Sequence, residues 1–463
     1  MARSPVRMEP HHQGNQVTSP VLPIESDSDS KARSSGARIK TISSDDDMAR
    51  RGLASRPAAL LLDLSGNRSD AIRWAERNIT EPEIWLIDKA DLKWESKLKA
   101  LKRLRGIEHY TFAVFTRDVT AQSMRGAMML FAILAGARRI VFGDTSGASL
   151  TRSRAAALLL DAPRSGIELA FGYVVLVPLT WLITMLLDAS QVFKKVQRES
   201  RVKVGPSSKS VLYVRGTLST ATEGGMVTHS SGFADGARAL GHRLLFLVCG
   251  RLGGDQDSTV SIKPSTLISA TRALYEVWNN LVFTVKSIIF IADRSESVKE
   301  IDFIYQRYSR FNWAGVALSL VTGRPLLLEF NGSEVWVSKR WDPVGLLWLL
   351  RMFERLNLKA ADLVFVVSDV ERRNLLDAGL APGKVIVNPN GVDTERFRPG
   401  CGGVNIRREL DIENTTVIGF LGTFGPWHGA PVLAEAVKLV GEDERRHFLF
   451  IGDGDQRAVT ESI

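Results

Sequence analysis

Cysteine is nearly absent from this chain, since only Cys249 and Cys401 occur in 463 residues. Two cysteines this far apart provide neither a disulfide framework nor the paired spacing of a metal site, which is typical of proteins in a reducing compartment. We therefore expect no structural metal. The beginning of the chain also lacks an apolar core, so a cleavable secretory signal is not expected.

The charge is unbalanced toward basic residues, with a formal net charge of +9 and a pI near 9.6. Such an excess suits nucleic acid, anionic lipid or phosphorylated substrates alike. Because the basic residues are not interleaved with aromatic ones, we expect no nucleic-acid partner. The chain is too long for one ordinary core, and its 44% hydrophobic and 24% charged residues are an ordinary globular balance, so we expect at least two domains.

The first third of the chain divides into a tail and a small domain. Residues 1–56 are rich in Ser, Asp, Arg and Pro and poor in large apolar groups, so we expect a disordered tail. Residues 57–150 alternate short apolar runs with helical stretches, which predicts a small α/β domain with a mostly parallel sheet. The predicted strands cover 58–64, 84–87, 111–115 and 139–142, and a predicted helix covers 89–104.

Residues 167–187 form the single long apolar stretch, with Glu168 at its edge as the sole charge. At a rise of ~1.5 Å per residue, this length just crosses a hydrocarbon core of ~30 Å. Basic residues lie on both sides, and Pro178 permits a kinked or re-entrant helix. Spanning, re-entrant and buried helices all stay open as alternatives. We expect residues 151–206 to be a membrane-associating helix followed by a basic linker.

A βαβ unit with a glycine-rich crossover opens the second half. The apolar strand 211–214 leads to Gly224 and Gly225, then to a helix that carries His229 near its start, and then to the strand 244–248. Glycines allow close approach of a ligand, and the start of a helix offers free N–H groups to an anion. A glycine pair of this kind is a weak signal by itself, and His229 is equally compatible with a solvated or structural role.

Polar groups follow a later strand of the same region. The strand 326–329 ends in Glu329, and the loop after it carries Asn331 and Glu334. Open α/β sheets bind ligands at the carboxyl ends of their strands. These side chains therefore either hold the hydroxyls of a sugar or cap the loop.

Two further glycine motifs follow. The run 388–393, with Asn390 and Gly391, comes after the strand 384–387, and the strand 417–421 leads to a glycine-containing loop at 422–429 and a helix at 430–440. Alone, Asn390 and Gly391 predict only a tight turn.

In this order, over residues 208–463, the motifs resemble the retaining family-four glycosyltransferases of the GT-B fold, whose acceptor and donor domains are both Rossmann-like. The resemblance implies an acceptor domain at 207–390 and the start of a donor domain at 391–463. It implies sugar transfer from a nucleotide sugar to a hydroxyl acceptor, with retention, without a metal and with no cofactor beyond that co-substrate. The apolar stretch 167–187 favours as the acceptor a glycan or lipid-linked molecule of cell-envelope or exopolysaccharide synthesis, and the basic residues after it favour the cytoplasmic face of the membrane.

The resemblance also assigns site residues. His229 is implied as the catalytic group that faces the transferred sugar. The implied substrate-binding residues are Gly224, Gly225, Glu329, Asn331, Glu334, Asn390 and Gly391. The implied donor-binding residues are Gly422, Thr423, His428 and Gly429. Thr423 and His428 occupy positions that an arginine and a lysine usually hold in the family.

The chain ends at Ile463, before the glutamate-bearing stretch that holds ribose and sugar in this family. We therefore expect a truncated donor domain. The alternative function is a catalytically inactive, GT-B-like binding or scaffold protein.

Overall fold

The computed structural model describes the greater part of the chain beyond residue 37. The described residues are 38–42, 58–65, 68–87, 97–107, 109–116, 118–119, 124–198, 209–218, 225–249, 259–293, 300–425, 427–441, 445–454 and 456–463. The predicted tail apart from 38–42, the first part of the predicted helix 89–104, and Gly224 lie outside them.

The first sheet has six strands in the order β1-β3-β2-β4-β5-β6 and is parallel except for β6. Its strands are β1 (Arg38–Ile42), β2 (Ala58–Asp63), β3 (Glu83–Ile87), β4 (His109–Thr116), β5 (Arg139–Asp144) and β6 (Ser149–Ser153). The helices of this region are α1 (Arg68–Asn78), α3 (Lys97–Arg105) and α4 (Arg125–Ala135). Leu60 and Phe112 belong to one apolar cluster and Leu61 and Phe115 to another, so successive residues of the strands alternate between the two. Burial on both faces explains why these strands are near-continuous apolar runs.

Strand β1 lies inside the region predicted to be a disordered tail, so that prediction is wrong for residues 38–42. Ile39 pairs with Ile84 of β3 and packs against the cluster that contains Leu61. The parallel ladder and this apolar contact offset the entropy lost when the strand orders. The polar composition around it concealed a short edge strand.

The second sheet has seven strands, all parallel, in the order β13-β12-β11-β10-β7-β8-β9. Its strands are β7 (Ser210–Arg215), β8 (Arg243–Cys249), β9 (Thr259–Ile262), β10 (Phe303–Arg307), β11 (Leu326–Phe330), β12 (Leu363–Val366) and β13 (Val385–Val387). Its helical segments are α8 (Gly225–Ala239), α9 (Arg272–Asp293), α11 (Ala314–Thr322), α12 (Glu334–Arg340), α13 (Leu347–Ala360), α14 (Asp369–Asp377) and the 3-10 turn η3 (Pro382–Lys384). The first strand, β7, lies between β8 and β10, so the strand order reverses there, and open sheets of this kind bind ligands at that point.

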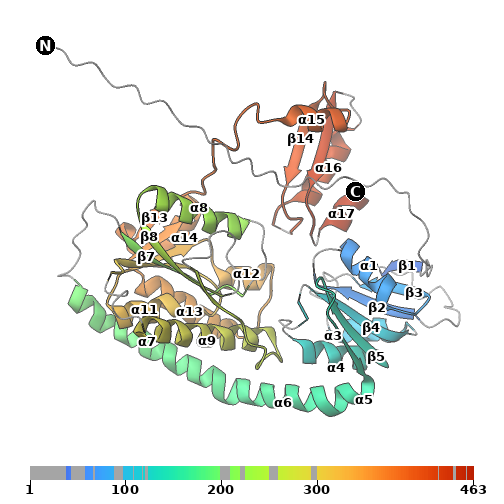
Figure 1. Ribbon diagram of the computed structural model, residues 1–463, viewed down its shortest axis with the longest axis horizontal. Helices are drawn as coiled ribbons and strands as arrows, with labels where there is room; N and C mark the ends of the chain where they lie inside the picture. Colours follow the sequence, from blue (N-terminus) through green and yellow to red (C-terminus); the bar gives the residue numbers. More distant parts are fainter. Residues whose placement is uncertain are drawn as a thin grey trace, which may run out of the picture. The chain divides into compact units, whose positions relative to one another are not determined.

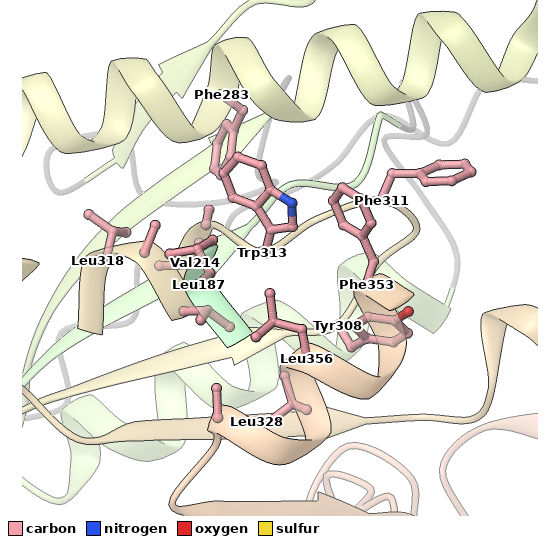
Figure 2. Close-up of a cluster of buried hydrophobic side chains, with 14 of the residues drawn as sticks. Leu187, Val214, Phe283, Tyr308, Phe311, Trp313, Leu318, Leu328, Phe353 and Leu356 are labelled. Carbon is pink, nitrogen blue, oxygen red and sulfur yellow. The ribbon is translucent and has the colours of Figure 1, made fainter. Parts of the chain in front are cut away.

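Large side chains fill the core of this second region (Figure 2). Trp313 stacks on Phe353 of α13 with ring centroids 5.7 Å apart, and Phe283 of α9 is fully buried beside them. Leu187, from a helix that precedes the sheet in the chain, belongs to the same cluster. A membrane-associating helix was predicted within residues 151–206. The structure shows that part of this helix belongs to the core of the second region.

Among the residues that the structure describes, one helical run, Arg154–Gln191, is long and apolar enough to cross a membrane, and 28% of its most apolar window is buried. Its segments are α5 (Arg154–Ala156), the π-helical turn η1 (Ala157–Asp161), α6 (Ala162–Phe171), the π-helical turn η2 (Gly172–Leu176) and α7 (Val177–Arg198) (Figure 1). Pro178 does not end the helix, because it lies two residues after the end of η2, where the hydrogen-bond ladder is already widened. The predicted basic linker begins as helix, since α7 continues to Arg198.

The third sheet pairs β14 (Thr416–Leu421) with β15 (Arg446–Ile451) in parallel. Its helices are α15 (Gly403–Glu409), α16 (Ala430–Val440) and α17 (Arg457–Ser462). Leu421 of β14 and two residues of α16, Val432 and Leu439, are largely exposed. The predicted α/β class with Rossmann-like parallel sheets is confirmed.

Candidate functional site

The second sheet brings three predicted site residues together at the carboxyl ends of β10 and β11. Glu329 Oε1 accepts a hydrogen bond of 2.6 Å from Asn331 Nδ2 and lies 3.4 Å from Nδ1 of His229, which projects from α8. Arg307, the last residue of β10, links them, since its Nη1 lies 3.1 Å from His229 Nδ1 and donates to Glu329 Oε1 in a short contact. The four side chains form one polar cluster, here called the His229 cluster.

The Arg307 contact constrains the protonation of His229. A guanidinium can only donate hydrogen bonds, so a bond from Arg307 requires His229 Nδ1 to accept and leaves the proton on Nε2. Glu329 is 4% exposed at its side chain, and Arg307 compensates its charge. The nearby Tyr305 hydroxyl stays protonated, because burial and the adjacent Glu329 carboxylate raise its pKa. The imidazole is thus held by a buried ion pair, while 27% of its side chain reaches solvent.

A cavity of about 450 Å³ opens beside this cluster. Arg307 and Asn331 line it, together with Glu334 at the start of α12. Its remaining lining residues are Gly216, Thr217, Leu218, Arg272, Tyr275, Glu276, Asn280, Tyr308, Ser309, Arg310, Gly332 and Val337. Gly216 is required by close packing, since a Cβ there would lie 1.6 Å from Nδ2 of Asn312.

Two arginines of the cavity share one carboxylate. Arg272 donates two hydrogen bonds of 2.6 Å to the Asp342 carboxylate, and Arg310 Nη2 donates one of 2.6 Å to the same group. Burial alone would raise the pKa of Asp342, but the hydrogen bonds and charge of Arg272, with those of Arg310, hold it well below its usual range. Burial raises the pKa of Glu334, and Arg310, whose Nε lies 2.9 Å from its Oε2, opposes that rise.

The cavity is therefore polar but not strongly cationic. Arg272 also donates a 2.9 Å bond to Glu276, so these two guanidiniums face three carboxylates. Sites for isolated phosphate groups expose unpaired cations, whereas alternating donors and acceptors suit hydroxyl groups.

Sequence reasoning missed Arg307, Arg272, Arg310 and Asp342. One signal was available for two of them. Arg307 is the last residue of β10 and Arg310 follows that strand, and the neighbouring strand β11 already carried predicted site residues at its end. Nothing local pointed to the pairing of Arg272 with Asp342, which are 70 residues apart in the chain.

Three other predicted substrate-binding residues, which the structure describes, have no hydrogen bond to this cluster. Gly225 is the exposed first residue of α8, while Asn390 and Gly391 are exposed in the connection after β13. That connection is ordered locally, because Asp393 Oδ1 accepts hydrogen bonds of 3.0 Å from the backbone N–H groups of Glu395 and Arg396.

The predicted donor loop is closed on itself. Trp427 Nε1 donates a 3.0 Å hydrogen bond to His428 Nε2, so Nδ1 carries the proton and donates to the carbonyl oxygen of Thr423. Both ring nitrogens of His428 are thus engaged within the loop. Gly429 adopts φ +72° just before α16, a conformation that favours glycine.

A second glycine fixes this loop against its neighbour. Gly452 has φ +138°, and a Cβ on it would lie 1.8 Å from the carbonyl oxygen of Gly422. The loop after β15 therefore packs backbone to backbone against the loop after β14, which only glycine permits.

Part of the chain matches the profile of a known family. Residues 223–396 match the profile of Glycosyltransferase Family 4. This match contains the His229 cluster and Asp342, and it covers less than half of the chain. No curated protein matches the chain.

Solved structures are similar at low identity. The structure of Anabaena HepE in complex with UDP is 18% identical over 55% of this chain and 64% of that one, with a TM-score of 0.38. A glycosyltransferase from Rickettsia africae is 19% identical over 55% and 63%, with a TM-score of 0.37. The UDP-GlcNAc 2-epimerase from Neisseria meningitidis bound to UDP-GlcNAc is 12% identical over 55% and 69%, with a TM-score of 0.37. The chain thus spans less than two thirds of the length of the first two.

Proposed function

We propose that this protein transfers a sugar from a nucleotide-sugar donor to a hydroxyl group of an acceptor. The observation that carries the proposal is the His229 cluster, which lies at the carboxyl end of a parallel sheet near its reversal of strand order, beside a polar cavity. The match of residues 223–396 to Glycosyltransferase Family 4 supports the class of reaction.

Each member of the cluster has a proposed role. His229 contacts the transferred sugar, with Nε2–H as a hydrogen-bond donor. Arg307 is a positioning residue that holds the imidazole through its contact with Nδ1, and Glu329 positions Arg307 through their ion pair. The cavity lined by Asn331 and Glu334 takes the acceptor, whose hydroxyls match its mixture of donors and acceptors.

The finer parts of the proposal follow the family resemblance and the apolar helix. The reaction retains the anomeric configuration, uses neither a metal nor a cofactor, and acts on a glycan or lipid-linked acceptor in cell-envelope or exopolysaccharide synthesis. The protein works at the cytoplasmic face of a membrane. Gly422, Thr423, His428 and Gly429 contact the donor diphosphate, for which His428 must first release its bonds to Trp427 and Thr423.

The test measures transfer of radiolabelled sugar by the full chain from a panel of nucleotide sugars to lipid-extract acceptors. We expect His229→Ala to lower the rate by roughly 10²-fold, since it removes a contact to the reacting sugar. Glu329→Gln should lower the rate less and shift its pH profile, because it acts through the imidazole. His242→Ala is the matched control, since His242 contacts the backbone of Lys209 at the opposite ends of the strands.

Three outcomes separate the alternatives. Transfer that persists in EDTA and gives an unchanged anomer by NMR supports the metal-free, retaining reaction. Calorimetric binding of nucleotide sugars without any transfer identifies a binding or scaffold protein instead. Transfer that His229→Ala leaves unchanged removes the role of this histidine.

A further inference from the structure

The helical run Arg154–Gln191 presents two different faces. One face packs on the domain of the second sheet and carries Gly172, Leu176, Thr180, Thr184 and Leu187, spaced three or four residues apart as one helical stripe. At Gly172 the helix comes so close to α9 that a Cβ would lie 2.4 Å from Leu274 Cδ1. This stripe is the docked face.

The opposite face is apolar and uncovered. Leu159 is 75% exposed, Ile167 70%, Val174 73% and Leu186 62%. The other large apolar side chains exposed on the run are Leu158, Leu160, Leu169, Phe171, Tyr173, Val175, Leu179, Trp181, Leu182 and Met185. This set is the outer face.

The polarity of the helix is inverted relative to a helix on a water-soluble surface. Such a helix turns its apolar stripe to the core and its polar residues to solvent. Here Thr180 and Thr184 face the protein, and their hydroxyls donate to backbone carbonyls one turn earlier, at 2.9 Å to Leu176 and 2.7 Å to Thr180. The polar groups are satisfied internally while the largest apolar groups point outward, so the medium that suits the outer face is hydrocarbon.

Contacts at both ends of the apolar stretch 167–187 argue against a spanning orientation. At the beginning of this stretch, Glu168 accepts a 2.7 Å hydrogen bond from the backbone N–H of Ser269. Twenty residues later, Asp188 pairs with Lys359 at 2.8 Å. These two points are ~30 Å apart along a helix, about the thickness of the hydrocarbon core. A spanning helix would place Ser269 and Lys359 on opposite sides of the membrane, although both belong to one domain.

Positive charge gathers around the beginning of the run. Arg164 pairs with Glu168 and Arg152 with Asp161, while Arg154 is exposed beside them. Burial and the nearby Arg164 lower the pKa of Arg125 on α4. Four guanidiniums against two carboxylates complement anionic headgroups.

We propose that the outer face of Arg154–Gln191 docks on an anionic lipid bilayer and lies in the plane of its surface, with the domain of the second sheet seated above it. A membrane partner was proposed above, and this inference says how the protein binds it. The inference depends on the helix and not on the chemistry of the His229 cluster. Interfacial helices of this kind bury their apolar side chains ~5–10 Å into the boundary of headgroups and acyl chains.

The first test is flotation of the full chain with vesicles of phosphatidylcholine alone or mixed with phosphatidylglycerol. We expect flotation that strengthens with phosphatidylglycerol and that the double variant Val174→Asp/Leu186→Asp abolishes. The matched control is Val404→Asp/Ile406→Asp, which places the same charges on exposed apolar positions of α15 and should float like the parent. Equal circular dichroism of all three proteins confirms folding. Flotation that survives the charges on the outer face overturns the proposal.

The second test measures depth. In a Cys401→Ser background, Cys249 is buried, and single cysteines at positions 159, 167, 174 and 186 take an environment-sensitive fluorophore. Quenchers fixed at known depths in the bilayer should report one shallow depth for all four positions. Depths that progress through the centre of the bilayer identify a spanning helix and overturn the proposal. Fluorophores shielded by concentration-dependent dimers, and unaffected by vesicles, identify a second copy of the chain and overturn it as well.

Discussion

At the scale of single residues, the sequence identified groups by their place at strand ends but not by their tertiary partners. Glu329, Asn331 and His229 were predictable, because the ends of parallel strands meet at one edge of a sheet. Arg307 joins His229 to Glu329 and decides which of their atoms accept hydrogen bonds, and no sequence motif marked this residue. His428 was predicted to donate a hydrogen bond to a phosphate group. In the structure, both of its ring nitrogens form hydrogen bonds inside the loop.

The first prediction concerns Asp342, which neutralises Arg272 and Arg310. The substitution Asp342→Asn removes the shared counter-charge, and we expect a loss of about 3 kcal/mol in the free energy of unfolding, at the lower end for buried pairs because 29% of the side chain is exposed. Asp235→Asn, on an exposed pair with Arg238 at 3.7 Å, should cost under about 0.5 kcal/mol. Urea unfolding followed by fluorescence measures both.

The effect of the same substitution on stability should depend on pH. The folded pKa of Asp342 is lowered, so its stabilising effect is complete above the unfolded pKa of about 3.9 and is lost as the pH falls through the folded value. The difference in stability between the parent and Asp342→Asn should stay constant from about pH 7 to 5 and narrow below about pH 4. A difference that persists unchanged at low pH would contradict the assignment.

At the scale of elements, the buried parallel strands were predicted well and the irregular elements were not. Apolar runs marked β2, β4 and β11, because a strand buried on both faces has little polar alternation. The π-helical turns η1 and η2 leave no composition signal, since they arise from packing. One of them begins at Gly172, where the helix packs tightly against Leu274 of α9.

The second prediction compares two glycines of that helix. Gly172→Ala gains ~1 kcal/mol of helix propensity, but the new methyl meets the fully buried Leu274, and overpacking costs ~1–3 kcal/mol, so we expect a net loss of stability. Gly166→Ala, on the exposed side of α6 with nothing within 4 Å, should instead stabilise by ~0.5–1 kcal/mol. Thermal unfolding of the two variants in parallel should give shifts of opposite sign. Stabilisation by both would mean that the helix does not pack at Gly172.

At the scale of the whole molecule, the sequence predicted the order of the α/β regions along the chain. It did not predict on which of these regions the apolar helix packs. Hydropathy reports only that a segment is apolar, and the structure shows that part of it belongs to the core of the second sheet through Leu176, Val177 and Leu187. The distinction depends on residues far downstream, so no local pattern contains it.

The third prediction follows from that shared core. A chain of residues 154–463 keeps the helix on its domain and should fold, with one cooperative transition for the second sheet. A chain of residues 209–463 lacks it and exposes the surface around Leu274, so it should aggregate or unfold at lower temperature. Size-exclusion chromatography and circular dichroism compare the two. Equal stability would show that the helix is dispensable to the core.

The downstream position of these contacts also sets an order of events during synthesis. Ser269 follows Glu168 by 101 residues, and Lys359 follows Asp188 by 171. At ~5–20 residues per second, the ribosome needs roughly 10–30 s after the helix is made before its last partner exists. Until the first of these partners, Ser269, has been made, neither face of the helix has its contacts with the domain of the second sheet. Docking of the domain is then the later step, which converts a nascent segment exposed on all sides into one with a single remaining apolar face.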